Sequence, residues 1–178
     1  MKQLFIYILI FISTLLLFNC KKYDEDGKRS WHKPEKRIVG TWYLKEFLVN
    51  GIDSVYKWNE IKTSDVTDTI SWQLINTRFS FDSERNIDIY ISNAHIYNSY
   101  YGSANYLHLA SKWDLNKSKQ ELQFETQYAF LKAGVTFINF SLLLSGNKSW
   151  EIKKLTDKEM ILETVNEDDK HLRLKLQK

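Results

Sequence analysis

The stretch RIVGTWYLKEFLVNG, residues 37–51, decides the fold of this chain. One face carries Trp42, Leu44 and Leu48, interrupted by Glu46, and the other face carries Tyr43, Phe47 and Val49. Alternation with a period of two is typical of a β-strand with one buried face. The closing pair Asn50-Gly51 favours a type I′ turn, because both residues tolerate positive φ. We therefore predict a long strand followed by a tight turn, after which residues 52–58 either pair back or open a loop.

Short runs with the same period continue to residue 177, separated by polar turns such as Asp82-Ser83. The residues expected to share buried faces are Ile75, Thr77, Phe79, Phe81, Ile87, Ile89, Ile91, Leu107, Leu109, Trp113, Leu115, Leu122, Phe124, Thr126, Trp150, Ile152, Met160, Leu162, Thr164, Leu172, Leu174 and Leu176. This spacing predicts an all-β domain of about eight to ten antiparallel strands. An up-and-down barrel removes exposed edges best. A β-sandwich is the alternative, because alternation does not determine closure.

Three segments depart from this pattern. Residues 59–71 are polar and irregular, which favours a loop. Residues 127–134 are compatible with one helical turn, and so is Pro34–Val39, where the proline lies near the start of the turn.

The first 19 residues have the composition of a signal peptide. Lys2 is followed by an apolar run from Leu4 to Phe18, which is shorter than the roughly 20 residues of a membrane-spanning helix. An uncleaved anchor helix is the alternative. Removing 19 of the 178 residues leaves 159, enough for one domain.

The end of this leader, Leu17-Phe18-Asn19-Cys20, resembles the lipobox of bacterial lipoproteins. The resemblance implies a lipid on Cys20 and a place in the cell envelope, as an outer-membrane lipoprotein facing the periplasm or the surface. Residues 20–36 then form a charged, solvated tether. Its cluster Asp24-Glu25-Asp26 resembles a surface-export signal, and a plain spacer is the equal alternative.

Composition excludes several classes of protein. A single cysteine rules out a disulfide scaffold. The net charge of +3 is too small to indicate nucleic-acid binding. The four histidines, His32, His95, His108 and His171, lack the short spacings of metal sites, and no nucleophile or phosphate-loop motif is present. We therefore expect neither an enzyme nor a metal or other cofactor.

The domain from residue 37 to 178 resembles the lipocalin-like lipoproteins of bacteria. The motifs that carry this resemblance are Gly40-Thr41-Trp42, Trp150-Glu151-Ile152, Leu155-Thr156, Met160-Ile161-Leu162 and His171-Leu172-Arg173-Leu174. It implies an eight-stranded barrel with a lumen, in which an arginine stacks over Trp42. Arg173 is the first candidate and Arg37 the second. If Leu172 and Leu174 face the lumen, Arg173 faces outward and cannot reach an inward-pointing Trp42.

Two hypotheses for function remain open. The first is a binding module whose barrel takes a small, largely apolar ligand. The second is an interaction or structural protein with a packed barrel, whose protein partner meets a tyrosine-rich contact loop within residues 93–106, containing Tyr97, Tyr100, Tyr101 and Tyr106. Tyrosines folded back over the barrel are the alternative explanation of that loop. Ser54 and Thr69 also lie in short motifs that resemble O-glycosylation acceptors.

Overall fold

The computed structural model describes a defined part of the chain. It comprises Tyr23, Glu25, Asp26 and residues 32–57, 59–62, 69–98, 102–104, 106–125, 128–131, 134–135, 149–166 and 168–178. The predicted signal peptide and Cys20 lie outside the described residues, as do Tyr100, Tyr101 and Thr126.

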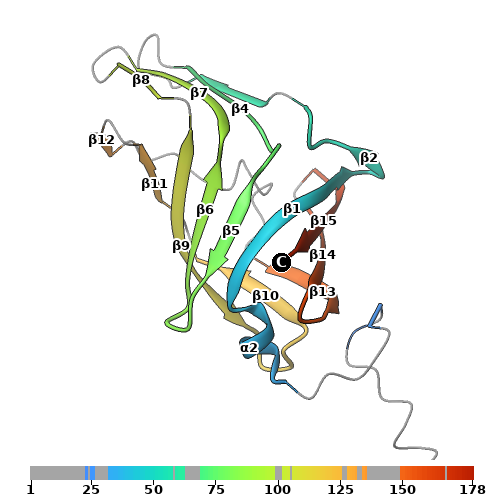
Figure 1. The fold of residues 1–178 in the computed structure, drawn as a ribbon. Coiled ribbons are helices and arrows are strands. Elements are labelled where there is room, and N and C mark those ends of the chain that lie inside the picture. Colours follow the sequence, from blue (N-terminus) through green and yellow to red (C-terminus); the bar gives the residue numbers. More distant parts are fainter. Residues whose placement is uncertain are drawn as a thin grey trace, which may run out of the picture.

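A closed antiparallel barrel of eight strands forms the body of the molecule (Figure 1). Its strands are β1 (Gly40–Val49), β5 (Arg78–Phe81), β6 (Asn86–Ile91), β9 (Leu107–Leu115), β10 (Glu121–Phe124), β13 (Ser149–Leu155), β14 (Glu159–Val165) and β15 (His171–Gln177). Each strand pairs with the next in this order, and β15 pairs back with β1. The prediction of an up-and-down barrel is confirmed, and closure excludes the sandwich.

Seven further strands extend this barrel. β4 (Thr69–Gln73) leads into β5, and β7 (Asn93–Asn98) continues β6, so the paired β4 and β7 rise beyond the barrel end (Figure 1). The others are β2 (Ile52–Asp53), β3 (Asn59–Lys62), β8 (Gly102–Ala104), β11 (Tyr128–Leu131) and β12 (Gly134–Val135). The predicted loop is therefore wrong at residues 59–62 and 69–71, and the predicted helical turn is wrong at residues 128–131. Pairing with neighbouring strands overrides weak local patterns.

The expected short elements around β1 are present. Helix α2 (Pro34–Ile38) begins at the proline. Asn50 and Gly51 have φ of 51° and 78°, the left-handed conformation that a type I′ turn requires. β2 then pairs back on β1, so residues 52–53 form a return arm. Within the described residues, no helix is long and apolar enough to cross a bilayer.

A bulge in β1 changes which side chains enter the core. The register against β15 shifts between Leu44 and Glu46, and such an extra residue reverses the facing of all that follow. Phe47 is consequently buried, whereas Leu48 stands opposite Arg173 on the outer face. The predicted face of Trp42, Leu44 and Leu48 is therefore wrong beyond Leu44. The bulge also explains why Glu46 occurs there, since it points outward.

Candidate functional site

The end of the barrel beside α2, here called the base, is built around Trp42. This side chain is fully buried, and its Nε1 donates a hydrogen bond of 2.6 Å to the Ile38 carbonyl. Lys178 Nζ lies 4.6 Å from the centroid of the Trp42 ring and donates to the carbonyls of Arg37 and Val39, each at 2.8 Å. Burial lowers the pKa of the Lys178 ammonium. The cation on the tryptophan is thus a lysine, held by its ring and by two carbonyls.

Gly40 makes this arrangement possible. Its φ of +127° is a conformation that residues with a side chain rarely adopt. A Cβ at this position would also meet Lys178 Cε at 3.2 Å. Gly40 therefore permits the close approach of the Lys178 side chain.

Arg173 does not stack over Trp42, so the first candidate for that contact is wrong. Its guanidinium lies on the outer wall, where it binds the Glu25 carboxylate through two hydrogen bonds of 2.9 Å and also pairs with Glu163. The reason is the parity already noted, because Leu172 and Leu174 are buried. Arg37, the second candidate, instead contacts the Tyr23 ring, the Asp26 carboxylate and the Leu155 carbonyl.

The predicted tether differs from expectation at three residues, Tyr23, Glu25 and Asp26, which we call the strap. Tyr23 and Asp26 are buried against the barrel. Arg37 lies over the Tyr23 ring at 5.6 Å and faces Asp26 at 3.7 Å. Burial raises the pKa of Tyr23 to about 12, so its hydroxyl stays protonated and donates to the Lys119 carbonyl at 2.9 Å. These three residues are part of the folded domain and do not act as a solvated spacer.

The barrel interior is apolar with a few polar atoms in it. Inward-facing side chains from all eight strands are buried, among them Trp113 and Trp150. The Trp113 ring packs edge-on against Phe81, with centroids 5.8 Å apart. Among the described residues, the Nε1 atoms of both tryptophans and Oγ1 of buried Thr77 have no hydrogen-bond partner. A buried donor without an acceptor costs about 1–3 kcal/mol, so these atoms suit a molecule that brings an acceptor.

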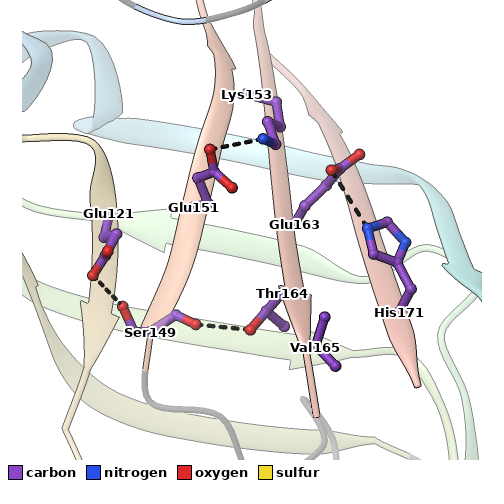
Figure 2. Close-up of a pocket in the computed structure, with 8 residues that line it drawn as sticks. All are labelled: Glu121, Ser149, Glu151, Lys153, Glu163, Thr164, Val165 and His171. Carbon is purple, nitrogen blue, oxygen red and sulfur yellow. Dashed lines mark hydrogen bonds and ion pairs between the residues drawn. The ribbon is translucent and has the colours of Figure 1, made fainter. Parts of the chain in front are cut away.

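A polar groove of about 490 Å³ lies on the outer wall (Figure 2). Its lining residues are Glu121, Ser149, Glu151, Lys153, Glu163, Thr164, Val165 and His171. The carboxylates already have partners: Ser149 donates to Glu121 at 2.8 Å, Lys153 donates to Glu151 at 2.7 Å, and His171 lies 3.5 Å from Glu163. The groove is therefore a satisfied charged surface and an unsuitable place for an apolar ligand.

Within the tyrosine-rich segment, residues 93–98 and 102–104 form strands, which corrects the predicted loop at these positions. Tyr97 is in β7, pairing with Thr69 of β4, and Tyr106 is partly exposed just before β9. His95, also predicted in a loop, is in β7. Ser54 is mostly buried, with Oγ donating to the Ile52 carbonyl at 3.3 Å, so the described conformation does not present it as an acceptor for a glycan.

Three of the histidines, His32, His108 and His171, lie beside carboxylates. His108 Nε2 lies 2.8 Å from Asp88, and its ring stacks on Tyr90 with centroids 4.2 Å apart. His32 lies 3.7 Å from Asp157. The part of the chain that the structure describes contains no cluster of three metal-binding side chains.

Comparison with known proteins adds little to this geometry. No family model matches the chain, and no curated protein matches it. A solved structure of a redesigned beta barrel aligns with 84% of this chain and 98% of its own length, at 11% identity and a TM-score of 0.35. The strand pairing itself defines the class, which is a closed eight-stranded antiparallel β-barrel.

Proposed function

We propose that this chain is a lipocalin-like lipoprotein of the bacterial cell envelope, anchored through lipid on Cys20, whose barrel interior binds a small, largely apolar molecule. The observation that carries the binding role is the pair of buried indole donors, Trp113 Nε1 and Trp150 Nε1, for which no described residue of the apolar interior supplies an acceptor. Apolar walls supply affinity by excluding water, and a few polar groups orient the ligand. The proposed ligand therefore combines an apolar body with one hydrogen-bond acceptor, such as a carboxylate or carbonyl.

The binding role is tested with a fluorescent long-chain fatty acid titrated into the Cys20→Ser protein. We expect saturable binding with energy transfer from tryptophan, weakened about fivefold by Trp113→Phe or Trp150→Phe, because a hydrogen bond of about 1 kcal/mol is lost. Tyr43→Phe, on the outer face, is the matched control and should bind like the unmodified barrel. Binding that is absent, or equal in all variants, contradicts the role of these donors.

The anchor is tested separately in a bacterium that processes lipoproteins. The motivation is the leader ending in Leu17-Phe18-Asn19-Cys20. Cys20→Ala should leave the protein soluble or unprocessed. If this variant still fractionates with membranes and matures to the same size, Cys20 is not the anchor.

A protein-binding role is the second candidate, and one observation favours it. Four large apolar side chains are exposed around the barrel end opposite the base, here called the far end: Ile52, Tyr56, Tyr106 and Val165. Apolar groups gathered at one end suit a contact surface. This candidate takes precedence if the fatty acid fails to bind and the interior proves to be packed by its own side chains.

A further inference from the structure

The part of β13 after Ile152 has an edge that β10 does not cover. β10 pairs with β13 only from Ser149 to Glu151, and the register of β13 against β14 then shifts between Ile152 and Lys154. A bulge at a strand edge leaves backbone N–H and C=O groups outside the ladder. Buried groups of this kind must find partners.

The strap supplies those partners. Glu25 N–H donates to the Lys153 carbonyl at 2.8 Å, and Asp26 Oδ1 accepts from the Leu155 N–H at 2.9 Å. Arg37 donates to the Leu155 carbonyl and faces the Asp26 carboxylate at 3.7 Å. The strap thus covers the edge of β13 that β10 leaves open.

Two side chains fasten the strap at its sides. Glu25 forms a two-pronged ion pair with Arg173 on the outer wall, and the hydrogen bonds from Arg173 hold the pKa of the Glu25 carboxyl below its ordinary value. Tyr23 is buried at the base, where its hydroxyl donates to the Lys119 carbonyl in the β9–β10 turn. The strap therefore has a defined position, with Tyr23 beside the base.

Chain length then limits where Cys20 can lie. It lies three positions before Tyr23, with Lys21 and Lys22 between them, and three extended residue steps span roughly 11 Å at most. The ten residues of β1 run about 33 Å along the strand, or about 25 Å along the axis of a barrel with strands tilted near 40°. Cys20 can therefore reach the surface around the base, but it cannot reach the opposite end.

We propose that the strap holds the barrel base-down on a phospholipid bilayer, with the β9–β10 turn close to the lipid headgroups and the far end directed away. This inference rests on the proposed lipidation of Cys20. The exposed charges at the base are mixed, with Lys36, Lys117 and Lys158 accompanied by Asp82 and Glu84. The orientation therefore depends on the short, docked connection to the lipid and does not require an anionic surface.

The sequence suits a direct test, because its single cysteine is taken by the lipid. A fluorophore is attached either at Lys117→Cys in the β9–β10 turn or at Asp168→Cys in the β14–β15 turn, in the full-length, membrane-processed protein reconstituted in phosphatidylcholine vesicles. A headgroup-linked quencher should reduce the emission at position 117 at least about twofold more than at position 168. Equal quenching at the two positions overturns the orientation.

Releasing the strap should remove the difference in quenching between positions 117 and 168. The double variant Glu25→Gln/Tyr23→Phe loses the Arg173 ion pair and the Lys119 hydrogen bond, and we expect its two labels to be quenched to within about 20% of each other; an unchanged difference means that the strap does not set the orientation. Hydrogen exchange at the Leu155 amide provides a second readout, which should be at least about tenfold faster in Asp26→Ala. Unchanged exchange there contradicts the docking. Labelled protein that never enters the vesicles shows instead that lipidation of Cys20 is wrong.

Discussion

The two ends of this barrel are finished in different ways. At the base, α2, the strap and Lys178 converge, and buried hydrogen bonds join them to one another and to β13. At the far end, β4 and β7 continue past the barrel as a paired ribbon, and large apolar side chains such as Ile52 and Tyr56 are exposed. This difference shows that the contacts that close the barrel are concentrated at the base, the end that we propose lies near the membrane. The other end retains exposed apolar side chains.

The largest effects on the free energy of unfolding are expected when a buried tryptophan is removed from each end. Trp42→Ala loses a fully buried ring, the hydrogen bond to Ile38 and the contact with Lys178. We expect it to lower the free energy of unfolding by about 4–5 kcal/mol. Trp72→Ala, also buried but in the β4 extension, should cost about 3 kcal/mol. Urea unfolding of both variants in the Cys20→Ser background measures the difference, and a larger loss at Trp72 would contradict the emphasis on the base.

Asp26 tests whether the strap contributes to the closed end. Asp26→Ala leaves the Leu155 N–H without its acceptor and the buried Arg37 guanidinium without the carboxylate that faces it, and we expect a loss of about 3 kcal/mol. Asp26→Asn keeps an oxygen in place and should cost about half as much. Urea unfolding followed by tryptophan fluorescence gives both values. Neutral effects of both substitutions would mean that the strap is not docked in solution.

A matched pair of glycines sharpens the contrast. Gly40 at the base and Gly51 in the β1–β2 turn both have positive φ, but only Gly40 has a neighbour, Lys178, that a Cβ would crowd. We expect Gly40→Ala to cost about 2 kcal/mol, by backbone strain and displacement of the lysine. Gly51→Ala should cost about 1 kcal/mol, by strain alone. Thermal unfolding distinguishes them, and equal costs would show that Lys178 yields freely.

The smallest effect expected concerns the pH dependence of the strap. Glu25 has a lowered pKa in the folded protein, so its ion pair with Arg173 contributes stability above the ordinary pKa of glutamate, about 4.3. That contribution disappears as the pH falls through the folded pKa. The pair is partly exposed, so Glu25→Gln should cost less than about 1 kcal/mol at pH 7 and nothing measurable at strongly acid pH. Urea midpoints across this range, with Glu84→Gln as control, check the sign; a difference that grows on acidification would refute the pairing.

The alternation of apolar residues was sufficient to predict the antiparallel strands, because inward and outward faces differ along nearly every strand, but it did not decide between a barrel and a sandwich. It also contained the position of Lys178, which continues the inward series Leu172, Leu174 and Leu176. The same parity that turns Arg173 outward therefore points to Lys178, and not to an arginine, as the cation over Trp42.

Other features had no local signal. The bulges in β1 and β13 are visible only as register shifts between paired strands. The strap is likewise a tertiary feature, since a charged segment is ordinarily solvated and its docking depends on backbone groups that the β13 bulge leaves unpaired. The polar β3 and the alternating β7 became strands because neighbouring strands were available to pair with them.

The most direct test of the whole account is native mass spectrometry of the full-length protein extracted from the membranes of its own host. We predict a chain that begins at Cys20 and carries the added mass of lipid acyl groups. The same spectrum should show a small, noncovalently retained molecule that is lost from the Trp113→Phe/Trp150→Phe variant. A chain that retains residues 1–19, or one that begins at Cys20 without added mass, would contradict the anchor, and a spectrum with nothing bound would contradict the binding role.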